Sequence, residues 1–228
     1  MVEKFFSSEI KDAGRTDIEI NKTDGIMSRN EITDFINDEL AKLREDPAKI
    51  PLENVEGSFL GWDEEDIDVD FEIDDSIESV LDRFDENEWE SLSEHERTDA
   101  IEELIFVVSK ALGIEKVPKV KFYSNGDDSY GGFIQDKNTI ELNKRFLDDP
   151  KEMVNTAMHE TRHAYQHMRA GILENPTDQM YKNNFDNYIY PIRDKNGNWI
   201  NFLDYQDQFV EAEARAFANL FDGEGVVA

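Results

Sequence analysis

The segment from Asp149 to Gly171 constrains the fold of this chain most strongly, because it carries the signals for both ends of one long helix. It opens with Asp-Pro-Lys-Glu, in which the aspartate suits the N-cap and proline suits the first helical position. Glycine is the residue type that most often follows a helix end. A largely apolar stripe runs along the segment: Val154, Met158, Thr161, Tyr165 and Met168. The pattern predicts a helix over 150–170 that packs on a core.

Two histidines, His159 and His163, lie one turn apart on this predicted helix, beside the apolar stripe. Glu160 points about 100° away from His159, since a helix has 3.6 residues per turn. The sequence His159-Glu160-Thr161-Arg162-His163 is therefore an HExxH motif, in which two imidazoles bind zinc and the glutamate serves as general base. Histidines at this spacing are also ordinary neighbours on a helix surface, which is the alternative interpretation.

A catalytic zinc ion has three protein ligands and one open position, so the motif requires a third ligand from another element. Residues 205–222 predict a second helix, with Asp204 as its N-cap and Gly223 after its end. On the face opposite the apolar one, Glu211 is followed at three and seven residues by alanines, which permit a close approach of the neighbouring helix. Glu211 is the preferred third ligand, and Glu213, which points to the other side, is the alternative.

The rest of the chain divides into three predicted parts. Residues 1–62 predict an accessory N-terminal helical module, and residues 63–75, with nine acidic residues, predict an acidic connector or a one-sided strand. Residues 76–228 predict the main domain, with a core helix over 98–112 and then three short β-type runs: 117–124, 132–135 and 139–143. A tight turn at 136–138 joins the last two runs into a hairpin. The expected fold class is α+β, with this small sheet packed on the HExxH helix and on a second ligand helix.

The composition excludes several kinds of chemistry. There is no cysteine, which rules out disulfides, thiolate metal ligands and a cysteine nucleophile. Residues 1–110 carry −23 of the net charge of −29, and such a field repels phosphate backbones, so nucleic-acid binding is not expected. The longest purely apolar run, 104–108, is too short to cross a membrane, and the N-terminus lacks the pattern of a signal peptide. We expect no membrane association, in a cytoplasmic protein or one exported without a conventional signal peptide, and the sequence leaves its oligomeric state open.

The order of these elements is similar to that of gluzincin-type zinc peptidases, above all the compact minigluzincin and ImmA/IrrE-like groups. Residues 210–218, Val-Glu-Ala-Glu-Ala-Arg-Ala-Phe-Ala, resemble the ExxA(D/N)xFA helix of those groups, in which the first glutamate is the metal ligand. The resemblance covers roughly residues 98–222, implies a zincin-like fold and favours Glu211 over Glu213. Those families commonly have aspartate four residues after the ligand, where this chain has Arg215. The carboxylate that usually supports a ligand histidine must therefore come from elsewhere or be missing.

The motifs and the resemblance predict a zinc-dependent peptidase with a polypeptide substrate. Zinc would be held by His159, His163 and Glu211, and Glu160 would activate a metal-bound water for attack on a peptide carbonyl. By the same resemblance, the strand around 131–134 would pair with an extended substrate through main-chain hydrogen bonds. Its glycine pair, Gly131-Gly132, equally fits a bulge or a loop.

Two rival hypotheses remain. The first is an acidic binding or docking protein, or a nucleic-acid mimic, with a structural or vestigial zinc site, which the charge imbalance and Arg215 favour. The second is a peptidase whose N-terminal part shields the cleft as a removable segment.

Three weaker signals complete the sequence interpretation. His167 continues the row of His159 and His163, but a bystander role is favoured over a ligand role. The segment between the two ligand helices carries four tyrosines, one of which could supply an oxyanion-stabilising hydroxyl: Tyr181, Tyr188, Tyr190 and Tyr205. Some positions near the N-terminus fit an EF-hand calcium loop, although Ile20 and Lys22 occupy its first and third positions, so an ordinary turn is favoured over Ca²⁺: Asp24, Gly25, Ser28 and Glu31.

Overall fold

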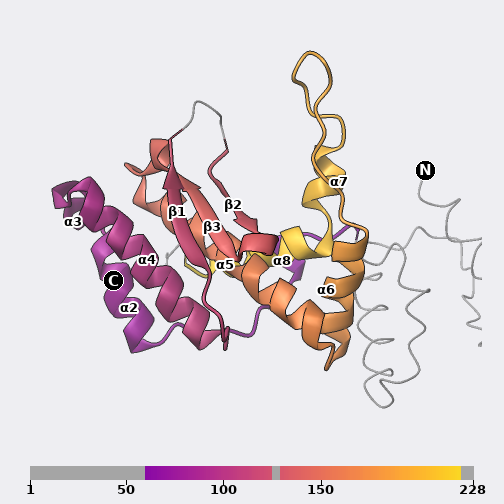
Figure 1. Cartoon of the computed structure of the whole chain (residues 1–228), viewed down its shortest axis with the longest axis horizontal. Helices are drawn as coiled ribbons and strands as arrows, with labels where there is room; N and C mark the ends of the chain where they lie inside the picture. Colours follow the sequence, from indigo (N-terminus) through magenta and orange to yellow (C-terminus); the bar gives the residue numbers. More distant parts are fainter. Residues whose placement is uncertain (1–59, 125–128, 222–228) are drawn as a thin grey trace, which may run out of the picture.

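The computed structural model describes residues 60–124 and 129–221. This part of the chain is α+β, as predicted, with seven α-helices and a three-stranded mixed sheet (Figure 1). The strands are β1 (Lys119–Tyr123), β2 (Gly131–Ile134) and β3 (Thr139–Asn143). The helices are α2 (Asp75–Leu81), α3 (Glu86–Ser91), α4 (Glu94–Ala111), α5 (Pro150–Ile172), α6 (Pro176–Asp186), α7 (Phe202–Gln206) and α8 (Phe209–Asn219).

Part of the sequence interpretation falls on residues that are not described. The predicted module over 1–62 lies almost entirely outside the described residues, and the calcium-type loop at 20–31 lies wholly outside them. Both stay predictions. Of the helices in the described ranges, none has the length and apolar character that a membrane crossing requires.

The sheet has the strand order β1-β3-β2, with β1 parallel and β2 antiparallel to β3. The predicted hairpin is confirmed, because β2 and β3 are joined by a short turn that ends at Asn138 in the left-handed conformation (φ 46°). Asparagine tolerates this conformation better than most residues. Among residues 60–124 and 129–221, β2 pairs only with β3, which leaves its other edge open to a further strand there.

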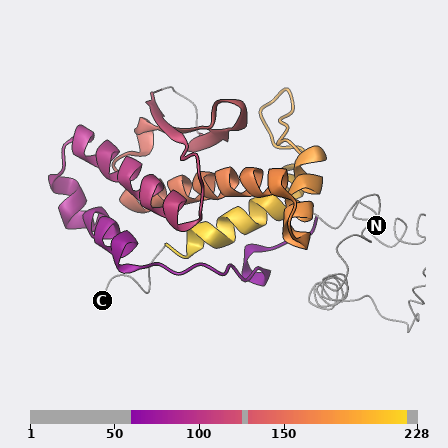
Figure 2. The same ribbon diagram turned by 60° about the horizontal axis from the view of Figure 1, so that its bottom comes forward.

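Helix α5 lies between the sheet and α8 and is central to the core (Figure 2). The side chain of Asp149 accepts a hydrogen bond from the backbone N–H of Glu152 at 3.0 Å, as expected of an N-cap. The predicted end at Gly171 is slightly wrong: the helix continues to Ile172, and Leu173 adopts the left-handed conformation there (φ 61°).

The predicted helix over 205–222 is wrong in its first part. The chain forms two helices there, α7 and α8, and Asp204 lies within α7 and does not cap α8. The break is at Gln208, whose backbone is extended and whose side chain is fully buried. Its amide donates to the carbonyls of Tyr205 and Ile189, both at 3.0 Å, and accepts from the Ile189 N–H. These bonds hold the chain away from a continuous helix.

The acidic segment 63–75 runs along α8 (Figure 2), where the structure assigns it a short 3-10 turn, η4 (Glu64–Asp66), and otherwise no strand or helix before Asp75. Its apolar side chains alternate with exposed acids, and Phe71 packs edge-on against Phe217 of α8 at 5.0 Å. The sequence predicted either an acidic connector or a one-sided strand. The structure shows an extended connector, one side of which is apolar and packs on the core.

Gly131 has a packing role that predicts a measurable loss of stability. A Cβ atom at this position would lie 2.8 Å from the Glu141 carbonyl oxygen and 3.1 Å from the Thr156 side chain on α5. Gly131→Ala should therefore lower the free energy of unfolding by about 1–3 kcal/mol, measured by urea denaturation. Gly132→Ala is the matched control, because its Cβ would meet nothing within 4 Å. Equal unfolding midpoints for the two variants would contradict this account.

Candidate metal centre

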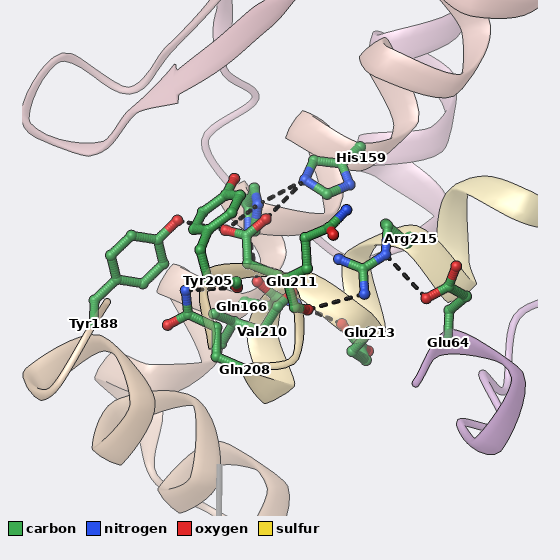
Figure 3. Close-up of polar contacts among 12 residues, drawn as sticks. Glu64, His159, Gln166, Tyr188, Tyr205, Gln208, Val210, Glu211, Glu213 and Arg215 are labelled. Atoms are coloured by element: carbon green, nitrogen blue, oxygen red, sulfur yellow. Dashed lines mark hydrogen bonds and ion pairs between the residues drawn. The ribbon is translucent and has the colours of Figure 1, made fainter. Parts of the chain in front are cut away.

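Helices α5 and α8 bring His159, His163 and Glu211 together at one point. Figure 3 shows the His159 side chain beside Glu211. The Nε2 atoms of the two histidines lie 3.0 Å apart, and each lies 3.4 Å from an oxygen of Glu211. The two imidazole rings are almost perpendicular, at 87°. The three predicted ligands thus converge from two helices. Glu211 follows His163 by 48 residues and His159 by 52 residues in the sequence.

The spacing of these atoms fits a zinc ion. Ligand atoms about 2.0–2.2 Å from a tetrahedral ion lie about 3.3–3.6 Å from one another. In this cluster the two Nε2 atoms are 3.0 Å apart, each lies 3.4 Å from a different oxygen of Glu211, and one ligand atom from each residue lies within 4.8 Å of the others. Two imidazole nitrogens and one carboxylate oxygen are also a usual protein donor set for catalytic zinc. Zinc therefore suits the donors and their separations.

The electrostatics of the cluster favour a positive charge between the helices. Burial alone would lower the pKa of His163, but the Glu211 carboxylate raises it to about 9. Burial alone would likewise raise the pKa of Glu211, but the two imidazoles hold it well below its usual value. Glu211 is only 1% exposed, so a buried carboxylate here requires a cationic partner, as a metal ion would be.

Glu213, the alternative ligand, faces away from the cluster. Its carboxylate accepts hydrogen bonds from Nε of Arg162 at 2.8 and 3.0 Å, and it also contacts the second guanidinium nitrogen. Tyr181 donates a further hydrogen bond to it at 2.9 Å. Because these partners neutralise Glu213 within the core, the structure leaves Glu211 as the carboxylate that faces the histidines.

Arg215, which stands where the resembling families have an acidic residue, lies apart from the histidines. Its guanidinium donates to the carboxylate of Glu64 at 3.0 Å (Figure 3). It also donates to the Gln206 carbonyl at 2.9 Å. Arg215 therefore ties the acidic segment and the end of α7 to α8. The partner of His163 is instead Gln166, whose Oε1 lies 2.8 Å from Nδ1 of His163.

The structure separates the four candidate tyrosines. The hydroxyl of Tyr188 donates to Oε1 of Glu211, and the hydroxyl of Tyr205 also interacts with Glu211 (Figure 3). Burial, followed by the nearby Glu211 carboxylate, raises the pKa of both hydroxyls, which stay protonated. Tyr181 contacts Glu213 instead, and Tyr190 is 71% exposed. Tyr188 and Tyr205 are therefore the two whose hydroxyls lie beside the cluster.

His167 lies outside the cluster of predicted ligands. Its ring stacks on Phe185 with a centroid separation of 3.7 Å and an interplanar angle of 11°. Burial, with a smaller contribution from His163, lowers its pKa to about 4, so the ring is neutral near pH 7. The row of three histidines on α5 thus divides into two that face Glu211 and one that packs on α6.

A pocket of about 680 Å³ opens at the cluster. Glu160, His163 and Glu211 line one part of it, and β2 with Tyr188 lines another. Glu160 is 9% exposed and is not among the three converging ligands. The predicted general base therefore lines the same pocket as two of the predicted ligands, His163 and Glu211, and as β2.

The sequence interpretation did not identify Gln166, although a signal was present. Gln166 follows His163 by three residues, the spacing that places two side chains on one face of a helix. Tyr188 was one of four candidates, and only the fold could select it, because the segment after α6 has no regular period.

Comparison with known proteins found no family model, curated protein or solved structure that matches this chain.

Proposed function

We propose that this chain is a zinc-dependent peptidase with a zincin-like fold. The observation that carries the proposal is the convergence of His159, His163 and Glu211, two of which, His163 and Glu211, line a pocket that Glu160 also lines. Two ligands come from one helix and the third from a neighbouring helix, and the catalytic candidate lies between the two histidines in sequence. A purely structural zinc site would instead use four protein ligands in a closed shell.

Each residue has a distinct role in the proposed reaction. His159, His163 and Glu211 would hold the ion, which when bound acts as a Lewis acid towards water and the peptide carbonyl. Glu160 accepts a proton from the attacking water and returns it to the leaving amine. The protonated hydroxyls of Tyr188 and Tyr205, which lie at Glu211, would turn from it to donate to the oxygen that becomes negatively charged.

The pocket suits an extended polypeptide. Strand β2 lines it, and in the described part of the chain only one edge of β2 is paired, so a strand-like segment can pair at the other edge through main-chain hydrogen bonds. Gly132 has no side chain to stand in the way, and a Cβ atom at this position would meet nothing within 4 Å, so the space beside it is open. We therefore infer that the substrate is a polypeptide bound as an additional strand, whatever its side chains.

Removal of the metal tests this function. A chelator should abolish hydrolysis of an unfolded protein, followed by mass spectrometry of the products, and one equivalent of zinc should restore it. Magnesium should not restore it, because nitrogen ligands suit zinc and Mg²⁺ prefers oxygen.

A chain that binds one zinc ion and cleaves none of a panel of unfolded proteins would contradict the peptidase proposal. It would favour the acidic docking protein with a structural or vestigial zinc site.

A further inference from the structure

Gln166 occupies a fully buried position between the metal centre and the Arg162–Glu213 ion pair. Its Oε1 lies 2.8 Å from Nδ1 of His163. Its Nε2 donates to Oε2 of Glu213 at 2.6 Å and to the carbonyl of Val210 at 2.9 Å. One amide therefore connects a predicted ligand to a buried carboxylate and to the backbone of α8.

The hydrogen-bonding capacity of these groups fixes the orientation of the amide. An ionised carboxylate and a backbone carbonyl only accept hydrogen bonds, so both must face the NH₂ group of Gln166. Its carbonyl oxygen must then face His163, and this oxygen can only accept. Nδ1 of His163 therefore carries the hydrogen and donates, which directs Nε2 towards His159 and Glu211 as the metal-binding nitrogen.

The contacts of Glu213 support this order, because both of its oxygens accept hydrogen bonds from Nε of Arg162. The Arg162 guanidinium, 7% exposed as a residue, contacts the carboxylate through two nitrogens. The same guanidinium lies 4.9 Å from the ring centroid of Phe217 and 4.5 Å from that of Tyr165, so its position is fixed by packing. The chain of contacts runs from Arg162 through Glu213 and Gln166 to His163.

We propose that Gln166 is the positioning residue for His163, and that the Arg162–Glu213 pair acts through it by setting which end of the amide faces the histidine. This assigns a role to Glu213 other than metal binding. It also explains how the chain supports a ligand histidine although Arg215 stands where the resembling families have a carboxylate. The inference rests on the metal site of the proposed function but not on peptide hydrolysis.

The test is the zinc dissociation constant of the folded protein, measured by competition with a chromophoric chelator. Gln166→Leu and Glu213→Gln should each weaken zinc binding by about 10- to 100-fold, the usual effect of losing a partner of a ligand histidine. Gln166→Glu should weaken it as well, because two carboxylates then meet where the wild type has a 2.6 Å hydrogen bond.

A swapped double variant makes the test specific for the order of donors and acceptors. In Gln166→Glu/Glu213→Gln, the new carboxylate accepts from His163 and the new amide donates to it, so zinc binding should recover relative to Gln166→Glu alone. A merely structural role predicts no such recovery, since the double variant changes two buried residues. The swapped variant also keeps the side-chain volumes, so the test still applies if Gln166→Leu does not fold.

Arg169→Met is the matched control. Arg169 is on the same helix and forms a bidentate ion pair with the buried Asp178, at 2.8 Å through each nitrogen, away from the histidines. Its loss should lower the melting temperature without changing the zinc dissociation constant.

If the Gln166 and Glu213 variants behave like this control, the positioning role is wrong; if the wild type binds no zinc, the metal site is wrong as well. Wild-type zinc affinity that depends on these residues, without any hydrolysis, would overturn only the peptidase.

Discussion

Glu160→Gln should lower the rate of peptide hydrolysis by about 100- to 10,000-fold and leave one zinc ion bound. The substitution keeps the size of the side chain but removes its ability to accept a proton. Glu160 lines the pocket and does not belong to the three-residue cluster, so its loss should not disturb the ion. The value of kcat/KM for an unfolded fluorogenic substrate, with elemental analysis of the same sample, measures both effects.

The control for this variant is Glu174→Gln, which makes the same chemical change just beyond the C-terminal end of α5. Glu174 is exposed and contacts Arg169 at 3.5 Å, so hydrolysis should be unchanged. Full activity of Glu160→Gln in protein that contains zinc would show that another group accepts the proton.

The elements that the sequence predicted well are those whose own residues determine them. Asp149 and Pro150 begin α5 as expected, and the β2–β3 hairpin follows from its short turn. The predicted helix over 98–112 corresponds to α4, which begins earlier because Ser93 and Glu96 form a capping box. These signals act over three or four residues, and a single sequence displays them fully.

The break between α7 and α8 could not be predicted in the same way. Gln208 interrupts the helix because its side-chain amide forms hydrogen bonds with Ile189 and Asn184, about 20 residues earlier in the chain. In the sequence, a glutamine is a good helix former, so the local pattern favoured one continuous helix. Tertiary hydrogen bonds here outweigh local propensity.

The candidate site shows the same division. The spacing of His159 and His163 placed two ligands on one face, and the alanines after Glu211 indicated a close helix contact. The partner of Glu213 could not be foreseen, because Arg162 lies on α5 and contacts Glu213 on the neighbouring helix α8. From the sequence, Gly131 suggested either a close approach of substrate or a bulge. In the structure, its lack of a side chain permits β2 to pack against α5.

The second large effect concerns the third ligand. Glu211→Ala should weaken zinc binding by more than about 100-fold, because the loss of an outer partner alone costs about 10- to 100-fold. Two imidazoles on one helix would remain, without the carboxylate that holds a positive charge beside them. Glu64→Ala is the control, since it removes a carboxylate that contacts α8 through Arg215 and not through the histidines.

The zinc content of the purified protein, measured by elemental analysis on the wild type and on Glu211→Ala, tests the metal centre most directly. The geometry predicts one zinc ion per wild-type chain after dialysis against metal-free buffer, and almost none in Glu211→Ala, with both proteins folded by circular dichroism. A wild-type chain without zinc, or a Glu211→Ala variant that retains one full equivalent, would contradict it.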